Sequence, residues 1–157
     1  MQTKVVKFGG SSLADAAQFK KVYDIIKSAD TRRYVVPSAP GKRFKEDTKV
    51  TDMLYNCYEK AAGGADVNEY FKDIEARYNE IIETLGIDMD LSGEYELIKK
   101  SFAHKAGKDY AASRGEYLNG LILAEYLGFD FIDPAGCIFF KENGTVDAER
   151  KNLTLGE

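Results

Sequence analysis

Apolar residues divide the start of the chain into two short strands around a helix. Residues 3–8 form an apolar run with β-branched members that ends at Gly9 and Gly10, which predicts a buried strand. A helical period follows in Phe19, Val22 and Ile26. Residues 34–36 form a second short strand. A strand, a glycine turn, a helix and a strand make a βαβ unit, so we expect the two strands to pair in parallel.

The middle of the chain has helical periodicity almost throughout. After a charged loop rich in Pro and Gly at residues 38–49, the pattern predicts helices over residues 50–62, 67–85, 94–105 and from 109 to about 127. Residues 129–132 are then expected as a third strand of the same sheet. Residues 137–146 are expected as a hairpin with an Asn-Gly turn. The tail from Asp147 shows no complete element.

The composition indicates a soluble domain and excludes several classes of protein. The 157 residues are 44% hydrophobic, enough for one domain with a real core. The net charge of −4 argues against binding to nucleic acid, which needs a surplus of Lys and Arg. No apolar run approaches the ~20 residues of a membrane helix. Cys57 and Cys137 lack CxxC spacing and fit the reduced thiols of a cytoplasmic protein. Acidic runs such as residues 88–90 lack EF-hand spacing, and we expect no metal site in this chain.

A possible phosphate-binding turn lies at the first strand–helix junction, in the sequence Lys7-Phe8-Gly9-Gly10-Ser11-Ser12. Two glycines let the backbone approach a ligand closely, and N–H groups at a helix start favour an anion. Lys7 adds a positive charge, and Ser11 and Ser12 are expected to cap the helix. The sequence is neither a Walker A motif nor the dinucleotide GxGxxG. By shape alone it also fits an ordinary tight turn.

Small hydroxyl residues follow the second strand. Residues 37–41 read Pro-Ser-Ala-Pro-Gly, and residues 49–52 read Lys-Val-Thr-Asp. Open α/β sheets bind ligands at the carboxyl ends of parallel strands, so Ser38 and Thr51 are candidates for binding a polar substrate. From spacing alone, plain helix capping by Thr51 or Asp52 is the simpler interpretation.

A third candidate lies inside the last long helix, in the sequence Ser113-Arg114-Gly115-Glu116. A glycine within a helix costs about 1 kcal/mol relative to alanine, and it can allow close packing or the approach of a ligand. Glu116 beside it could offer a carboxylate to an ammonium group. Taken alone, Glu116 also fits a solvated surface position. His104 is the only histidine, and no nucleophile pattern accompanies it.

Taken together, these motifs resemble the aspartate kinases of the amino-acid kinase superfamily. Lys-Phe-Gly-Gly-Ser-Ser is followed by Val-Val with Ser38-Ala39-Pro40-Gly41, then by Lys-Val-Thr-Asp and by Ser-Arg-Gly-Glu. The order and rough spacing match over essentially the whole chain. The first motif is quite specific, whereas Arg-Gly-Glu alone would be weak. Pro37 before Ser38 and the long loop to Thr51 are variations on the pattern.

The resemblance implies a fold, a reaction and seven site residues. The fold is an α/β fold, a three-layer α/β/α sandwich of the amino-acid kinase type, with residues 1–157 as its N-terminal lobe. The reaction transfers the γ-phosphoryl of ATP, with Mg²⁺, to the β-carboxylate of L-aspartate in lysine, threonine and methionine synthesis. Phosphates would be bound by Lys7, Gly9, Gly10 and Ser11. Aspartate would be bound by Ser38, Thr51 and Glu116, with Glu116 pairing with the α-ammonium group.

The chemistry of this reaction suits the residues present. A β-carboxylate with a pKa near ~4 is already ionised at neutral pH, so the reaction needs alignment and charge neutralisation rather than a general base. The family carries a further segment with most of the nucleotide site, an organising aspartate and an arginine that binds the substrate carboxylate, followed by ACT domains. We find none of these before Glu157, so we expect residues 1–157 to be inactive alone.

Two alternatives remain open from the sequence. One is a kinase of the same superfamily for another acid, such as glutamate or N-acetylglutamate. The other is a non-catalytic lobe that serves binding or assembly. In each case we expect a cytoplasmic protein that forms a homo-oligomer and binds neither nucleic acid nor a membrane.

Overall fold

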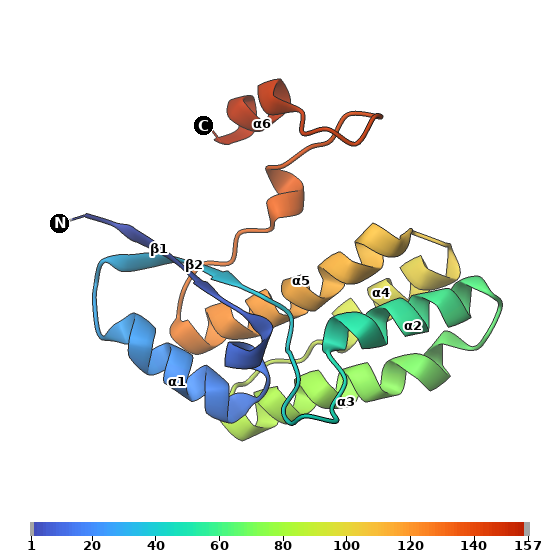
Figure 1. The fold of residues 1–157 in the computed structure, drawn as a ribbon, viewed down its shortest axis with the longest axis horizontal. Helices are drawn as coiled ribbons and strands as arrows, with labels where there is room; N and C mark the ends of the chain where they lie inside the picture. Colours follow the sequence, from blue (N-terminus) through green and yellow to red (C-terminus); the bar gives the residue numbers. More distant parts are fainter. Residues whose placement is uncertain (1, 156–157) are drawn as a thin grey trace.

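Two parallel strands joined through a helix form the first part of the fold. The computed structural model describes residues 2–155. Strand β1 (Lys4–Phe8) pairs in parallel with β2 (Arg32–Pro37), and helix α1 (Ala16–Lys27) connects them (Figure 1). Lys7 lies opposite Val36 in the register. The predicted βαβ unit and its parallel pairing are therefore confirmed.

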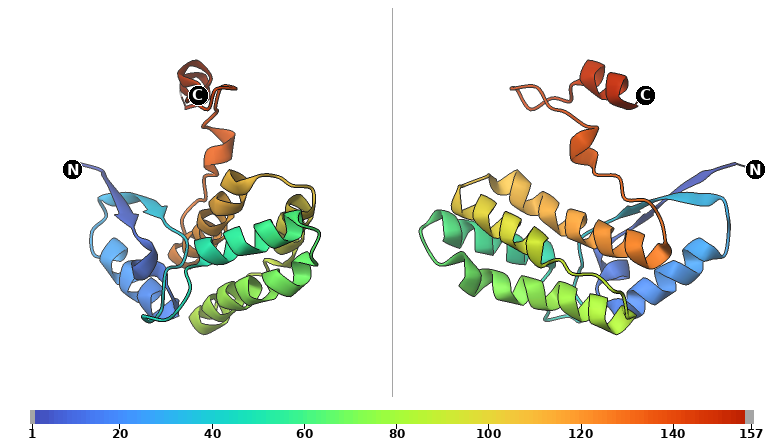
Figure 2. Two further views of the ribbon diagram at one scale, coloured as in Figure 1. Left: turned by 45° about the vertical axis from the view of Figure 1, so that its right-hand side comes forward. Right: turned by 180° about the vertical axis from the view of Figure 1, so that it is seen from behind.

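Four helices pack beside this unit and supply most of the core (Figures 1 and 2). They are α2 (Val50–Ala62), α3 (Val67–Leu85), α4 (Ser92–Ala103) and α5 (Lys108–Leu127). Their bounds agree with the predicted helices to within about two residues. Gly86 and Gly128 end α3 and α5 in the left-handed conformation, at φ of 68° and 70°. Within residues 2–155, no helix is both long and apolar enough to cross a membrane.

The two faces of the sheet differ in their burial. Val6, Phe8 and Val35 pack against the helical core. On the opposite face, Val5 is 69% exposed and Tyr34 is 58% exposed. Because side chains alternate along a strand, one face of the sheet is covered and the other is open. The described residues thus form a mixed α/β fold with a small parallel sheet.

The entry into α1 differs from the prediction. Residues Gly10–Leu13 form a short 3-10 helix, η1, that contains Ser11 and Ser12. The cap of α1 is Asp15, whose side chain accepts a hydrogen bond from the Gln18 N–H at 2.9 Å. The prediction that the two serines cap the helix was wrong, because the chain makes this extra turn before the helix begins.

Residues 129–132 do not form the predicted third strand. They carry no strand pairing in the described chain. The Phe131 ring instead packs on α5, with its centroid 5.6 Å from that of Tyr117 and its edge against Gly120. Side-chain packing on a helix therefore takes the place of a hydrogen-bonded ladder to β2.

The segment after α5 projects away from the helices (Figure 2). It contains a short 3-10 helix, η2 (Pro134–Gly136), and the helix α6 (Ala148–Leu155). The predicted Asn-Gly turn is present, with Gly144 at φ of 80°, but the hairpin pairs only through the bridge from Phe140 to Val146. The tail was predicted to hold no complete element, and α6 corrects that prediction.

Candidate functional site

Two glycines bring separate segments of the chain into backbone contact. We call residues 9–14 the Gly turn and residues 38–49 the 38–49 loop. The Gly41 N–H donates to the Gly10 carbonyl at 2.8 Å. A Cβ on Gly41 would lie 2.6 Å from the Gly10 carbonyl carbon, which is closer than Cβ atoms come to other atoms in proteins. The Ser38 N–H also donates to the Phe8 carbonyl, so both segments are fixed at the carboxyl ends of β1 and β2.

Helix α5 meets the 38–49 loop through a third glycine. A Cβ on Gly115 would lie 2.7 Å from the Ala39 Cβ and 3.2 Å from Leu54 Cδ1 on α2. Close packing therefore explains this glycine inside a helix, and it sets Glu116 beside the loop. We call this meeting point of the Gly turn, the 38–49 loop, α2 and α5 the glycine junction.

The predicted substrate residues come from three segments that meet at the glycine junction. Ser38 begins the 38–49 loop and is half-buried. Thr51 lies in the first turn of α2, one turn before Leu54. Lys49 occupies the N-cap position of α2, so the alternative reading of Thr51 or Asp52 as its cap is wrong. Glu116 is exposed on α5.

The predicted phosphate residues lie at the end of β1. Lys7 is exposed and belongs to the open face of the sheet, as Val5 does. The Ser11 amide is 2.8 Å from the position that a Gly41 Cβ would take, so the Gly turn adjoins the glycine junction. A Cβ added to Gly9 would have no neighbour within 4 Å, so there is room for a ligand beside Gly9.

A groove runs along the edge of β2 and continues under the segment after α5. Its volume is about 730 Å³ and its lining is mainly apolar, from residues such as Val36, Pro37, Leu123 and Phe131. Glu116 and Arg114 line it as well, and the Arg114 guanidinium stacks between Tyr110 and Tyr117. Glu116 is thus open to solvent and to a ligand in this groove.

Two functional candidates on α3 and α5 were missed from the sequence. The buried Asn119 side chain donates through Nδ2 to the Ser38 carbonyl at 2.7 Å. The buried Tyr78 hydroxyl donates to the Gly115 carbonyl at 2.9 Å, and burial raises the Tyr78 pKa, with a smaller contribution from the charge of Glu116. Both side chains support the backbone of a predicted site segment.

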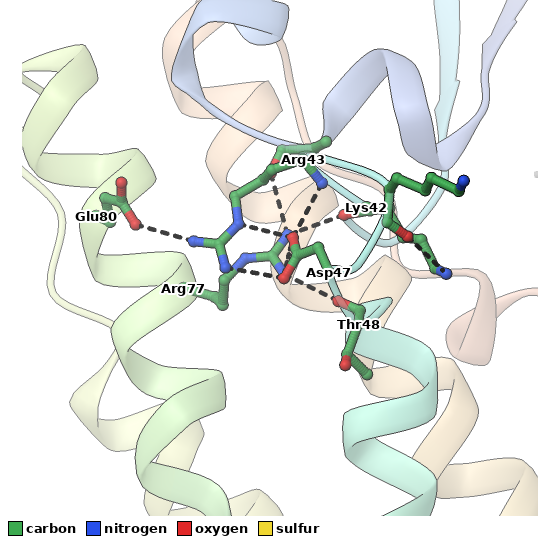
Figure 3. Close-up of polar contacts among 9 residues, drawn as sticks. Lys42, Arg43, Asp47, Thr48, Arg77 and Glu80 are labelled. Carbon is green, nitrogen blue, oxygen red and sulfur yellow. Dashed lines mark hydrogen bonds and ion pairs between the residues drawn. The ribbon is translucent and has the colours of Figure 1, made fainter.

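An ionic cluster joins the 38–49 loop to α3 (Figure 3). Asp47 is 8% exposed and accepts from Arg43 Nε at 2.7 Å, while Arg77 Nη1 lies 3.4 Å from its Oδ2. The hydrogen bonds from Arg43, together with the charge of Arg77, hold the Asp47 pKa well below its usual range. We call Arg43, Asp47 and Arg77 the arginine cluster. Its signal in the sequence was an arginine at position 77 within the apolar period of Ile74, Tyr78 and Ile81.

Replacing Asp47 is expected to remove a stability that depends on pH. A lowered carboxyl pKa stabilises the fold above the ordinary value of about 4, and this contribution is lost as the pH falls through the lowered pKa. We expect Asp47→Asn to destabilise the chain by about 3 kcal/mol near neutral pH, since it leaves the charge of the buried Arg77 without its carboxylate partner. Urea unfolding from about pH 7 down to about pH 2 should show a constant difference above about pH 4 and a shrinking difference below it.

The exposed Asp73 on α3 offers a matched control for this comparison. Asp73→Asn removes a carboxylate from the same helix and should leave stability nearly unchanged at each pH. A constant gap between Asp47→Asn and the parent over the whole pH range would contradict the account.

The described residues contain no group of three or more His, Cys, Asp or Glu side chains arranged to hold a metal ion.

Comparison with known proteins was decisive for the family. The model of the amino acid kinase family matches residues 2–154, nearly the whole chain. The chain belongs to the amino acid kinase family.

Within this family, the chain is similar to aspartate kinases. It is 33% identical to aspartokinase 3 of Bacillus subtilis, over 93% of this chain and 35% of that protein. It is 30% identical to the chloroplastic aspartokinase 2 of Arabidopsis thaliana, over 80% of this chain and 24% of that protein. This amino acid kinase chain thus spans about a third or less of the relatives it matches.

Solved aspartate kinases share the fold. All of this chain aligns with 36% of the Clostridium acetobutylicum aspartate kinase, with a TM-score of 0.94 and 50% identity. Escherichia coli aspartokinase III, solved in complex with aspartate and ADP, aligns with a TM-score of 0.74 and 20% identity over 99% of this chain and 37% of that chain. The second likeness is one of fold alone.

Proposed function

We propose that residues 1–157 form the N-terminal lobe of an aspartate kinase domain, which phosphorylates the β-carboxylate of L-aspartate with ATP and Mg²⁺. The similarity to the Clostridium acetobutylicum enzyme supports the substrate class. The open face of the sheet, with Val5, Tyr34 and Val36 exposed, supports completion of the sheet into three layers by further chain.

The glycine junction is the observation that carries this proposal. Phosphoryl transfer needs two anions held close together and in line, with little covalent chemistry from the protein. The junction joins a turn suited to phosphate, near Lys7, to the segments that bear Ser38 and Thr51. Backbone contact without intervening side chains makes that short separation achievable.

Each predicted residue has a role in this proposal. Lys7 and the N–H groups of Gly9, Gly10 and Ser11 neutralise phosphate charge. The hydroxyls of Ser38 and Thr51 bind the carboxylates of aspartate through hydrogen bonds. The exposed carboxylate of Glu116 pairs with the α-ammonium group, which selects an amino acid with a free amine.

The proposal extends to the state of the protein in the cell. The free thiols of Cys57 and Cys137 support a cytoplasmic location. Burial raises the Cys57 pKa to about 11, which fits an unreactive core thiol. The exposed apolar face of the sheet supports association with further chain or with a second copy, in keeping with the expected homo-oligomer.

A chimeric enzyme provides the test of this function. Residues 1–157 are joined to the part of the Clostridium acetobutylicum aspartate kinase that lies outside the alignment, and acyl phosphate formed from ATP and Mg²⁺ is trapped as the hydroxamate. We call this protein the chimera. We expect product with L-aspartate and little with L-glutamate or N-acetyl-L-glutamate. Residues 1–157 alone should give none, since both reactants must be held.

Other outcomes identify the alternatives. Preference for L-glutamate or its N-acetyl form would support a kinase for another acid. A folded chimera with no activity on any of the three acids would support the non-catalytic lobe.

Glu116→Gln is expected to weaken aspartate binding in the chimera. Losing a charge-assisted hydrogen bond costs about 1.5–3 kcal/mol, so KM for L-aspartate should rise by up to about 100-fold, with a smaller change in KM for ATP. Glu125→Gln is the matched control, because Glu125 is also an exposed acid on α5. Equal effects of the two variants would remove Glu116 from the site.

A further inference from the structure

Arg77 is a buried charged side chain on the otherwise apolar face of α3. It lies in the middle of α3, its side chain is 5% exposed, and the residues around it on that face include Ile74, Tyr78 and Ile81. Burial lowers the Arg77 pKa, although an arginine remains protonated at neutral pH. A buried guanidinium is costly unless its N–H groups find acceptors, and those of Arg77 have four.

Its partners come from two segments that are distant in the sequence. Nη2 donates to the Ala14 carbonyl at 3.1 Å and to the Gly41 carbonyl at 2.9 Å. Nη1 donates to the Thr48 carbonyl at 3.1 Å and contacts the Asp47 carboxylate. One side chain therefore binds the end of the Gly turn and two separate parts of the 38–49 loop. Figure 3 shows Arg77 beside Asp47 and Thr48.

These two segments carry the residues proposed to bind the two reactants. The Gly turn contains Gly9, Gly10 and Ser11, and the 38–49 loop runs from Ser38 to the start of α2. The Val50 N–H donates to the Pro40 carbonyl at 3.1 Å, so the start of α2, which carries Thr51, is bonded to the loop. None of the proposed ligand-binding residues is itself a partner of Arg77.

We propose that Arg77 is a positioning residue for phosphoryl transfer, because its guanidinium fixes the phosphate-binding segment relative to the aspartate-binding segment. The inference rests on the proposed function. It adds a residue on α3 that touches neither reactant and acts through Ala14, Gly41 and Thr48.

The bonding pattern requires an arginine. A guanidinium is planar and carries N–H donors in a fixed fork, whereas an ammonium group is a single compact charge. Here Nη2 bonds the Ala14 and Gly41 carbonyls while Nη1 bonds Thr48 and contacts Asp47. Lysine at position 77 keeps the charge, but its one nitrogen cannot occupy both Nη positions, so an ammonium group beside Asp47 leaves the two carbonyls that Nη2 bonds. Arg77→Lys is therefore the variant that removes the link and retains the ion pair.

The first test measures kinetics in the chimera. Because each segment still binds its own reactant, we expect Arg77→Lys to lower kcat by about 100-fold with small changes in both KM values, as misplacement of reactants by about 1 Å does. Ile74→Val is the matched control, since Ile74 is buried one turn away on α3 and its side chain has no hydrogen-bond donor for the carbonyls of either segment. It should lower the Tm and leave kcat within about threefold of the parent.

The second test needs no turnover and uses residues 1–157 themselves. We expect Arg77→Lys to speed amide hydrogen exchange in both the Gly turn and the 38–49 loop, and Ile74→Val to speed exchange in neither segment selectively. If Arg77→Lys does not fold, Arg43→Gln replaces it. That variant removes the ion pair between Arg43 and Asp47, and Asp47 in turn contacts Arg77. It should therefore produce a smaller change in the same two segments.

The outcomes separate this inference from the proposed function. An inactive parent chimera would contradict the proposed function, while the exchange result would still decide whether Arg77 links the two segments. A kcat for Arg77→Lys that matches Ile74→Val would overturn the positioning role. Exchange that changes in only one segment, or in neither, would overturn the link itself.

Discussion

Lys7→Met in the chimera is expected to lower kcat by about 10³-fold with little effect on stability. Removing one preorganised donor from a developing negative charge typically costs two to three orders of magnitude in rate. Lys7 is exposed on β1, so the fold does not depend on its side chain. The measurement is hydroxamate formation at saturating L-aspartate and ATP, together with the Tm of each protein.

Lys4→Met is the control for Lys7. Lys4 is an exposed lysine at the other end of the same strand, and its replacement changes the net charge equally. A role for general positive charge near the sheet would make the two variants alike. A kcat for Lys7→Met within about threefold of the parent would remove Lys7 from the phosphate site.

Gly41→Ala is expected to disrupt the glycine junction and to lower both stability and turnover. The new Cβ would lie 2.6 Å from the Gly10 carbonyl carbon, 2.8 Å from the Ser11 nitrogen and 2.9 Å from the Gly10 oxygen. All three are backbone atoms, so no side chain can rotate away and the two segments must separate. We expect a loss of about 1–3 kcal/mol in unfolding free energy, and a fall in kcat/KM of at least about 100-fold.

Gly93→Ala is the control for Gly41. A Cβ on Gly93 has no neighbour within 4 Å, and this residue lies in the first turn of α4. Alanine there should be neutral or stabilising by up to about 1 kcal/mol, because it favours the helix. Equal stability of Gly41→Ala and Gly93→Ala would show that the Gly turn and the 38–49 loop do not touch as described.

The elements with strong apolar periods could be predicted from the sequence. The helix over residues 67–85 is an example, since its buried residues recur at helical spacing from Phe71 to Ile82 and Gly86 marks its end. The parallel pairing of β1 with β2 also followed from the helix between them. Residues 129–132 looked like a strand for the same local reasons, but the packing of Phe131 on Gly120 decided otherwise. Such tertiary contacts leave no local signal.

The residue types of the candidate site could be predicted from the sequence, but the contacts that hold its segments together could be predicted only in part. The motifs around Gly9, Ser38 and Glu116 pointed to the segments that approach the glycine junction. The reason that Gly41 and Gly115 are glycines lies in contacts between distant segments, and periodicity does not report these. Arg77 was visible only as a polar exception in an apolar stripe. Three of its four acceptors are backbone carbonyls, which every residue carries, so the sequence does not mark them.

The most direct measurement of the central claim is a crystal structure of the chimera with L-aspartate and ADP. The account predicts the aspartate at the glycine junction, with its α-ammonium group on the Glu116 carboxylate and its carboxylates near the Ser38 and Thr51 hydroxyls. It also predicts the ADP phosphates over the Gly turn, within reach of Lys7. Aspartate bound away from Glu116, or phosphates bound by residues other than those of the Gly turn and Lys7, would contradict it.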